Sequence, residues 1–472
     1  MALLLSACSR QETAQGDEYL VGAYYYSWYP ENFSKGFLRG RLNPRQIPKL
    51  GLYDSRDPDV AQRHIEWAST HGIDFFLLSW WPSRAHQNKA FDTGFLRAPN
   101  IGDIRFCFFY ETQALGHDSD FGITLMNEET IGRLVDDVVF LAEQYFDHPS
   151  YLYLNGRPVM VFYLTRTINV NYEKAFQKIR AALKPLGHDP FIIGDEIFWK
   201  VTQGHGDWDE NPASYPQPEQ TELPQWDRVR LFDAITAYNV YEGGKTGHAG
   251  YASESGHFTD VDELYTRYAG NVPIVPMVLP GYNDRGVRLR RDNYAIPRQW
   301  RAGDMEGSLF AAYLKNIAWK HMDDGLKMFF ITSWNEWNED TAIEPLQTSP
   351  STNQDRSPDG KAYTQGYSYS GHGMAYLEVV RNVVVAVSGH VADAHGRSMK
   401  NVRIGAWNPK GALVATALTN SGGYYSFSRK RLPSGEFLIG PADFEERKSV
   451  AVNRDQTIVN VDFFLRESGA NQ

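Results

Sequence analysis

The sequence predicts a (β/α)8 TIM barrel, an α/β fold, followed by a small all-β sandwich domain. Two observations support this prediction. Between residues 19 and 332, short and continuously apolar segments alternate with segments of helical periodicity, and after Val387 the pattern changes to a period of two broken by turns. Continuous apolarity is typical of parallel strands buried on both faces. With 472 residues the chain is too long for one ordinary domain, so two are expected.

Eight segments have the length and apolarity of barrel strands. They are Tyr19–Tyr26, Asp74–Trp80, Arg105–Tyr110, Pro158–Leu164, Phe191–Gly194, Ala234–Tyr238, Pro273–Leu279 and Lys327–Thr332. Helical patterns lie between several of them, over Asp57–His71, Glu129–Gln144, Tyr172–Leu186, Val261–Tyr268 and Gly307–Met322. Eight βα units predict a closed barrel over residues 18–383. A doubly wound open sheet is the alternative, and it would be favoured by a glycine-rich phosphate turn after the first strand, which is absent.

Residues 386–466 have the pattern of short antiparallel strands separated by glycine-containing turns, which predicts a β-sandwich. This segment resembles the carboxypeptidase-regulatory-like modules of secreted bacterial proteins. The resemblance rests on the Ser-Gly-x-Val-x-Asp sequence at 388–393 and on Gly-Tyr-Tyr-Ser-Phe at 423–427. It implies a spacer or accessory module without peptidase activity.

The first 17 residues predict a lipid anchor and a polar tether. Leu5-Ser6-Ala7-Cys8 fits a lipobox, in which Cys8 is lipidated and becomes the mature N-terminus. This predicts a protein of the bacterial cell envelope that meets the membrane only through its lipid. A disordered N-terminus with a chance cysteine is the alternative. The other cysteine, Cys107, lies in an apolar run and is expected to be a buried free thiol.

The charge of the chain argues against a nucleic-acid partner. Its net charge is −10, its isoelectric point is about 5.7, and no basic patch stands out. The sequence contains no phosphate-binding loop, dinucleotide fingerprint, HExxH motif or GxSxG elbow, and its 13 histidines show no metal-ligand spacing. We therefore expect neither a cofactor nor a metal, while the oligomeric state stays open.

Polar and aromatic residues gather where the predicted strands end. Catalytic residues of a barrel lie at the C-terminal ends of its strands. A long segment from Glu196 to Arg228 is expected to shape the cleft there. The residues expected to bind substrate are Tyr25, Tyr26, Trp28, Trp80, Trp81, Glu111, Tyr238, Tyr282, Asp284, Asn335 and Trp337.

Two carboxylates, Glu336 and Glu339, follow the eighth strand directly and are set among tryptophan and asparagine residues. Glycosidic bond cleavage needs a general acid, a second carboxylate and flat apolar surfaces for sugar rings. If this stretch is helical, residues three apart face the same way and both carboxylates enter one cleft. Neighbouring indoles would then raise the pKa of one carboxyl, while better hydrogen bonding keeps the other ionised. A capping or salt-bridging loop is the alternative.

These residues resemble glycoside hydrolase family 99, the endo-α-mannosidases and endo-α-mannanases, and the related WbsX-type proteins. The matching motifs are Tyr-Tyr-Ser-Trp-Tyr at 25–29, Pro-Gly-Tyr-Asn-Asp at 280–284, Asn-Glu-Trp-Asn-Glu-Asp at 335–340 and Ile-Glu-Pro at 343–345. The resemblance implies a (β/α)8 barrel and a retaining glycosidase without an enzyme-bound glycosyl ester. Glu336 would deprotonate the sugar 2-hydroxyl, which attacks the anomeric carbon, and Glu339 would protonate the leaving oxygen.

One residue departs from the family pattern: Asp340 stands where the family has glycine. A carboxylate close to Glu339 would raise its pKa or bind substrate hydroxyls. The expected function is cleavage of α-mannosidic linkages in a polysaccharide or glycan. Two alternatives remain, a related enzyme acting on another bacterial polysaccharide and a glycan-binding surface lipoprotein without turnover.

Overall fold

The computed structural model describes most of the chain. The described residues are 19–82, 85–115, 117–118, 123–125, 127–169, 172–202, 220–240, 254–289, 295–300, 304–454 and 456–465. The predicted lipidation site, Cys8, and the tether lie outside these residues. So do residues 203–219 of the segment expected to shape the cleft.

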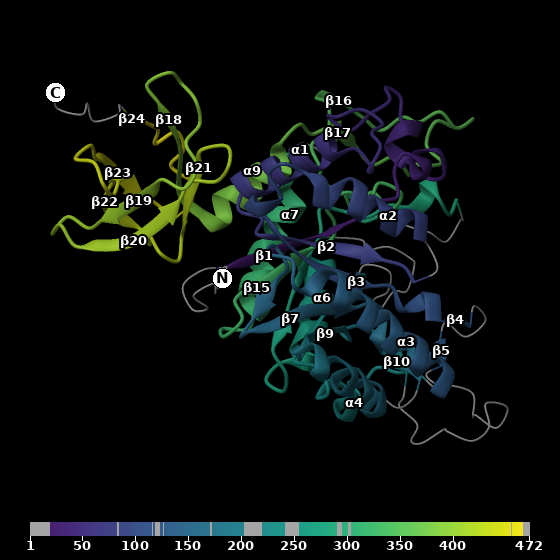
Figure 1. The fold of residues 1–472 in the computed structure, drawn as a ribbon. Coiled ribbons are helices and arrows are strands. Elements are labelled where there is room, and N and C mark those ends of the chain that lie inside the picture. Colours follow the sequence, from purple (N-terminus) through teal and green to yellow (C-terminus); the bar gives the residue numbers. More distant parts are fainter. Residues whose placement is uncertain are drawn as a thin grey trace.

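A parallel sheet surrounded by helices forms the larger part of the molecule (Figure 1). Its strands are β1 (Leu20–Tyr25), β2 (Phe75–Trp80), β3 (Arg105–Tyr110), β7 (Arg157–Phe162), β9 (Phe191–Asp195), β12 (Ala234–Thr236), β13 (Ile274–Val275), β14 (Met277–Val278) and β15 (Met328–Ile331), with the short β6 (Tyr153–Leu154) paired to β7. Sequential strands lie side by side in parallel, and β1 also pairs with β15. All eight predicted strands are confirmed, as is the barrel.

The barrel closes through a seventh strand that Pro276 divides. The first half, β13, pairs with β12, and the second half, β14, pairs with β15. Proline lacks an N–H and cannot donate to a sheet. Its carbonyl still accepts a 2.9 Å hydrogen bond from the Phe330 N–H, so the ring of strands continues past the division.

Helices pack around the sheet. They are α1 (Pro58–Thr70), α2 (Ala85–Thr93), α3 (Glu128–Leu141), α4 (Tyr172–Leu183), α5 (Trp226–Val229), α6 (Glu254–Tyr268), α7 (Ser308–Tyr313), α8 (Trp319–His321) and α9 (Ala375–Val384). The five predicted helices are confirmed, although α7 and α8 are joined by a π-helical turn at Leu314–Ala318. Helix α9, which the sequence analysis did not predict, covers the barrel next to α7.

Side-chain alternation along β1 separates the inside of the barrel from the layer under the helices. Tyr24 points inward, where its ring contacts Phe109, Tyr238 and Phe330. Tyr25 points outward, and its hydroxyl lies 3.1 Å from Nδ1 of His64 on α1. The C-terminal residues of each strand therefore divide into those that face the barrel opening and those that pack beneath helices.

Two smaller sheets follow the barrel and fit the predicted sandwich. One contains β18 (Val385–Asp393), β21 (Tyr424–Ser428) and β24 (Phe463–Leu465), and the other β19 (Arg403–Trp407), β20 (Leu413–Leu418), β22 (Gly435–Pro441) and β23 (Lys448–Val452). Their inward residues, Val387, Ile404, Phe427, Ile439 and Phe463 among them, form a separate apolar core. Short strand pairings also occur. β4 (His117–Asp118) pairs antiparallel with β5 (Ile123–Leu125), which pairs in parallel with β8 (Ile168–Asn169). β10 (Val201–Thr202) pairs antiparallel with β11 (Gln220–Thr221), and β16 (Ser349–Thr352) with β17 (Tyr369–Gly371).

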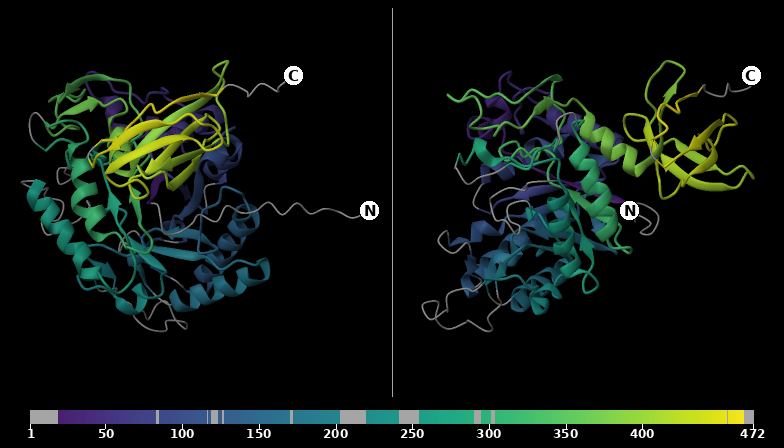
Figure 2. Two further views of the ribbon diagram at one scale, coloured as in Figure 1. Left: turned by 90° about the vertical axis from the view of Figure 1, so that its left-hand side faces the viewer. Right: turned by 180° about the vertical axis from the view of Figure 1, so that it is seen from behind.

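The sandwich is attached to the barrel without an intervening linker, because α9 ends at Val384 and β18 begins at Val385. Both valines belong to the barrel core, and a Cβ added at Gly72 would lie 2.5 Å from a methyl of Val384. Ser421 of the sandwich donates its N–H to Asp103 of the barrel at 3.0 Å. Figure 2 shows the sandwich next to α9, away from α4.

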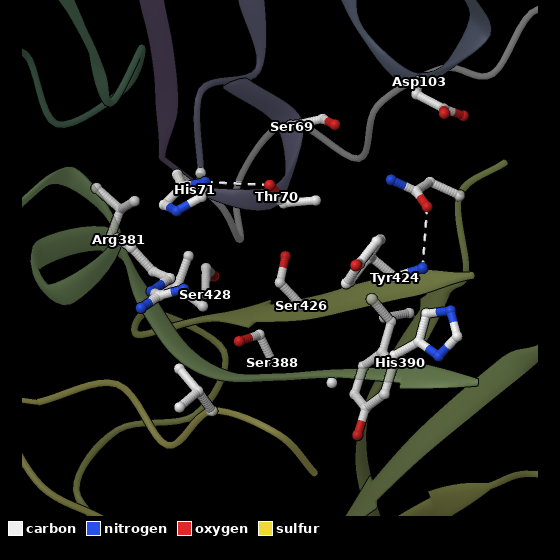
Figure 3. Close-up of a pocket in the computed structure, with 18 of the residues that line it drawn as sticks. Ser69, Thr70, His71, Asp103, Arg381, Ser388, His390, Tyr424, Ser426 and Ser428 are labelled. Carbon is white, nitrogen blue, oxygen red and sulfur yellow. Dashed lines mark hydrogen bonds between the residues drawn. The ribbon is translucent and has the colours of Figure 1, made fainter. Parts of the chain in front are cut away.

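A polar cleft of about 1030 Å³ lies between the two parts (Figure 3). Its walls come from the end of α1, from Asp103, and from the outer faces of β18 and β21, including His390 and Tyr424. It also includes Tyr19 and Asp74, which precede β1 and β2. The cleft is therefore at the N-terminal ends of the barrel strands. Among the described residues, none of the helices is both long and apolar enough to span a membrane.

A glycine inside the barrel provides a test of this packing. A Cβ at Gly22 of β1 would lie 2.4 Å from the Phe75 ring and 2.8 Å from Leu77. We expect Gly22→Ala to destabilise the protein by about 1–3 kcal/mol, because the interior has no space for an added methyl. Guanidinium unfolding measures the change. Gly132→Ala on α3 is the matched control: that Cβ meets open space, and the helix should gain about 0.5–1 kcal/mol. Equal stability of the two variants would contradict the packing described.

Candidate active site

The two predicted carboxylates lie in a tight turn that follows β15. The turn is not helical, contrary to the condition considered from the sequence. Instead, the N–H of Thr341 donates to the carbonyl of Glu336 at 3.1 Å, and the N–H of Glu336 donates to Ser333 Oγ at 2.7 Å. This turn still brings the two groups close enough for their charges to interact.

Glu336 is the more buried of the two, with 4% of its surface exposed. Its carboxylate accepts a 2.8 Å hydrogen bond from the N–H of Asn338. Burial raises the pKa of Glu336 well above its usual value, and the negative charge of Glu339 raises it further. The site without substrate therefore favours the protonated form of Glu336.

Glu339 is paired with an arginine that the sequence analysis missed. The guanidinium of Arg288 lies 3.1 Å from Glu339 and 3.0 Å from Asp284. Burial lowers the pKa of Arg288, but the charges of Glu339 and Asp284 outweigh this effect and raise it. Arg288 therefore connects the carboxylates of Asp284 and Glu339 through one guanidinium. The spacing of Asp284 and Arg288, four residues apart, is the one sequence signal that could have indicated the pairing.

Two tyrosines and a tryptophan form one side of the site. The hydroxyls of Tyr26 and Tyr238 lie 2.5 Å apart, and the Tyr26 ring stacks on Trp28 with centroids 4.5 Å apart. Burial raises the pKa of Tyr26, followed by the charges of Glu111 and Glu336. The hydroxyl of Tyr26 thus lies among the carboxylates, which confirms that the ends of β1, β3 and β15 meet.

Glu111 is held at the end of β3 by the neighbouring strand. Ser79 Oγ donates to its carboxylate at 2.6 Å, and the indole N–H of Trp81 donates to the same Ser79 oxygen at 3.0 Å. Glu111 is buried, whereas Trp81 is partly exposed. Ser79 therefore connects the residues that directly follow β2 and β3.

The segment Pro280-Gly281-Tyr282 needs its glycine. A Cβ at Gly281, whose φ is +152°, would lie 2.5 Å from Cγ of Arg298 and 3.0 Å from the carbonyl of Ile296. The close approach lets Tyr282 exchange two backbone hydrogen bonds with Ile296, at 3.0 and 2.8 Å. This fixes the loop that carries Tyr282 and Asp284, and the Tyr282 hydroxyl is near enough to Arg288 to affect its charge.

Asn335 connects the turn after β15 to the end of β1. Its side-chain oxygen accepts from the N–H of Tyr26 at 2.8 Å, and its amide nitrogen donates to the Tyr26 carbonyl at 2.9 Å and to Tyr53 Oη at 3.2 Å. It is fully buried. Its role is therefore to hold Tyr26 next to Glu336.

Three residues predicted to bind substrate are not brought to the site. Tyr25 packs under α1 against His64, as described above. Trp80 packs outward against Tyr110 and Phe140 of α3. Trp337 is fully buried, and its indole N–H donates to Glu344 at 3.1 Å. The aromatic composition suggested sugar contact, but the alternation of strand faces and the tight turn direct these rings into the core.

The carboxylate of Asp340 points away from Glu339, so neither effect expected from the sequence describes it. Its oxygens lie 2.6 Å from Nε of Arg39 and 3.1 Å from Nε of Arg298. Both arginines are buried. Among the described residues, no group of three or more His, Cys, Asp or Glu side chains could hold a metal ion.

The sequence and the fold are similar to those of several known proteins. Rat glycoprotein endo-alpha-1,2-mannosidase is 22% identical over 381 residues, covering 72% of this chain and 71% of that protein. The uncharacterized protein WxcX of Xanthomonas campestris (strain B100) is also 22% identical, covering 72% of this chain and 52% of its own length. A solved structure described as a glycoside hydrolase-like protein has a TM-score of 0.51 at 19% identity, covering 78% of this chain and 94% of that one, and supports the fold.

The GH99 endo-alpha-mannosidase of Bacteroides thetaiotaomicron has a TM-score of 0.48 at 18% identity, covering 76% of this chain and 97% of that one. The sequence model of a family described as "Glycosyltransferase WbsX" matches residues 14–353, which is more than half of the chain and includes both carboxylates. The chain therefore belongs to the WbsX glycosyltransferase family.

Proposed function

We propose that this protein is a retaining glycoside hydrolase that cleaves α-mannosidic linkages in a polysaccharide or glycan. The observation that carries the proposal is the coupled pair Glu336 and Glu339 at the C-terminal ends of the barrel strands, beside Tyr26 and Glu111. Two carboxylates in different environments are the chemical requirement of glycosidases. The endo-mannosidase relatives support α-mannosides as the substrate class.

The two carboxylates take different steps. Glu336 accepts the proton of the sugar 2-hydroxyl, and that oxygen attacks the anomeric carbon as the glycosidic bond breaks. Glu339 gives its proton to the departing oxygen, so a 1,2-anhydro sugar and a free hydroxyl result. Water then opens the anhydro ring at the anomeric carbon: Glu339 takes a proton from the water, and Glu336 returns one to the 2-oxygen. In α-mannosides the axial 2-hydroxyl lies opposite the axial leaving group, which permits the attack.

The raised pKa of Glu336 opposes the state that this route needs. Glu336 holds a proton more tightly than an ordinary glutamate because it is buried and lies near the charge of Glu339. The route requires that the proton of the pair lie on Glu339 when the 2-hydroxyl attacks.

The surrounding residues provide the sugar contacts. Trp28 and Trp81 supply partly exposed indole surfaces, and Tyr26 and Tyr238 supply hydroxyls next to the carboxylates. Glu111 offers an acceptor for sugar hydroxyls, held in place by Ser79. Aromatic surfaces with a few fixed polar groups are typical of small-molecule sites.

The family match favours one second candidate, an enzyme acting on another bacterial polysaccharide. The family is described as a glycosyltransferase family, and WxcX is a bacterial relative. The same two carboxylates could pass the glycosyl group to a sugar hydroxyl in place of water. A glycan-binding protein without turnover is the remaining alternative. A screen of α-mannans, bacterial exopolysaccharides and host glycans, with detection of reducing ends and of transfer products, distinguishes the three.

Replacing either carboxylate tests the proposal. We expect Glu336→Gln and Glu339→Gln each to lower turnover at least about 10³-fold, because each removes one of the two proton-transfer groups. Turnover is measured on the best substrate from the screen, and circular dichroism checks the fold. Glu129→Gln, at an exposed position of α3, is the control and should keep wild-type turnover. Near-wild-type activity of either active-site variant would refute the assignment.

The raised pKa of Glu336 predicts a pH dependence. The reaction needs one proton on the pair, since Glu339 must have a proton to give while Glu336 is ionised. As the pH rises through the raised pKa of Glu336, both carboxylates become ionised and kcat/KM falls. This basic limb should therefore lie well above the value of about 4.3 usual for glutamate. Arg288 lowers the pKa of Glu336, so Arg288→Gln should move this limb to higher pH. A limb at ordinary glutamate values, or a shift to lower pH in the variant, would argue against Glu336 as the base.

We also propose that Cys8 carries a lipid that anchors the protein in a bacterial cell envelope, and that the sandwich is a carboxypeptidase-regulatory-like spacer. The support is the sequence Leu5-Ser6-Ala7-Cys8 and the motifs at 388–393 and 423–427. Expression in bacteria with labelled palmitate should give a labelled protein in the membrane fraction. Cys8→Ser should lose the label and Cys107→Ser should keep it. If neither the wild-type protein nor Cys107→Ser carries the label, the lipid anchor is refuted.

A further inference from the structure

The residue after Glu339 has an unusual backbone conformation. Asp340 has a φ of +50°, in the left-handed region that glycine adopts without strain. Glycine stands here in the family 99 pattern. An aspartate in this region is strained relative to glycine.

The side chain of Asp340 belongs to a buried charge cluster, which we call the Asp340 anchor: Asp340, Arg39 and Arg298. Arg39, on the 3-10 turn Leu38–Arg41, donates to Asp340 at 2.6 Å. Arg298 donates from Nε to Asp340 at 3.1 Å. Each of the three side chains has 1% or less of its surface exposed. Charge-assisted bonds between buried groups are strong and geometrically demanding.

The Asp340 anchor also forms hydrogen bonds with the backbone of the turn that carries Glu336 and Glu339. Arg298 Nη2 donates to the carbonyl of Asp340 and to that of Ala342, both at 2.8 Å. The same arginine packs where a side chain at Gly281 would be. Arg298 thus connects the turn of Glu339 to the segment that carries Tyr282 and Asp284.

The two arginines depend on Asp340 for their charge balance. Among the described residues, the other carboxylate at the cluster is Glu306, 3.7 Å from Arg39 and bonded to the hydroxyl of Tyr376 at 2.9 Å. Arg298 lies over the Tyr376 ring, 5.0 Å from its centre. Without Asp340, two buried cations would share one carboxylate, which is unfavourable. Glycine at 340 could not replace this role.

We propose that Asp340 is a positioning residue that fixes the orientation of Glu339 relative to Glu336 through Arg39 and Arg298. This inference rests on the proposed glycosidase function. Asp340 does not face the substrate. It holds the turn whose backbone carbonyl at Glu339 accepts from Asn283 and whose carbonyl at Glu336 accepts from Thr341. A shift of about 1 Å in a catalytic group can cost about 10²-fold in rate.

The test uses Asp340→Asn and Asp340→Gly in the full chain. Asparagine keeps the size and tolerates positive φ, while glycine removes the strain and the side chain together. Both variants should lower kcat by about 10- to 100-fold with KM changed less than about twofold, since the substrate contacts remain. Hydrogen exchange of a peptide covering residues 333–344 should increase in both.

Asp233→Asn is the matched control. Asp233 forms a two-bond ion pair with Arg157, at 2.6 and 2.9 Å, next to the N-terminal end of β12. This variant should lose stability but keep kcat and the exchange of 333–344. Wild-type kcat in Asp340→Gly, or a loss of kcat in Asp233→Asn equal to that in Asp340→Asn, would overturn the positioning role.

The exchange measurement separates the two proposals. If the wild-type protein cleaves nothing in the screen, the glycosidase function fails. Unchanged exchange of residues 333–344 in both Asp340 variants would refute the anchor even then. Increased exchange there, with the rest of the barrel as protected as in wild type, would support it.

Discussion

The bond between Asn335 and the backbone of Tyr26 is the contact on which the site depends. It joins the end of the first strand to the end of the last, beside the pairing of β1 with β15. Tyr26 is one of the two joined residues and Glu336 directly follows the other, so this bond sets the separation of their backbones. A buried amide bonded at both ends is costly to disturb. The buried carboxylate of Glu344, bonded to Trp337 and Tyr53, supports the same turn from the other side.

The framework around Asn335 places Glu336 and Glu339 in different environments. The turn buries Glu336 against backbone amides, while Glu339 stays partly exposed and reaches Arg288. Their difference therefore arises from depth in the fold rather than from residue type.

Much of the barrel was predictable because its strands are buried on both faces and are continuously apolar. The carboxylates were predictable because they directly follow such a strand. The faces of individual aromatic residues were not assigned correctly. Tyr25 and Tyr26 differ by one position, and the period of two places only Tyr26 at the opening. Arg39, Arg288 and Arg298 could not be assigned, since their partners depend on contacts between distant segments. Helix α9 was missed at the boundary between two different periodicities.

The cleft beneath the sandwich and the carboxylates lie at opposite ends of the barrel. Tyr19 lines that cleft just before β1 begins, so the chain enters the barrel at the end opposite to Glu336. The sandwich is fixed to the same end by the valines that α9 and β18 share with the barrel core. Any attachment upstream of Tyr19 would therefore hold the protein at the end of the barrel opposite to the carboxylates. A glycan that reaches the carboxylates would then approach from the side of the barrel far from the point of attachment.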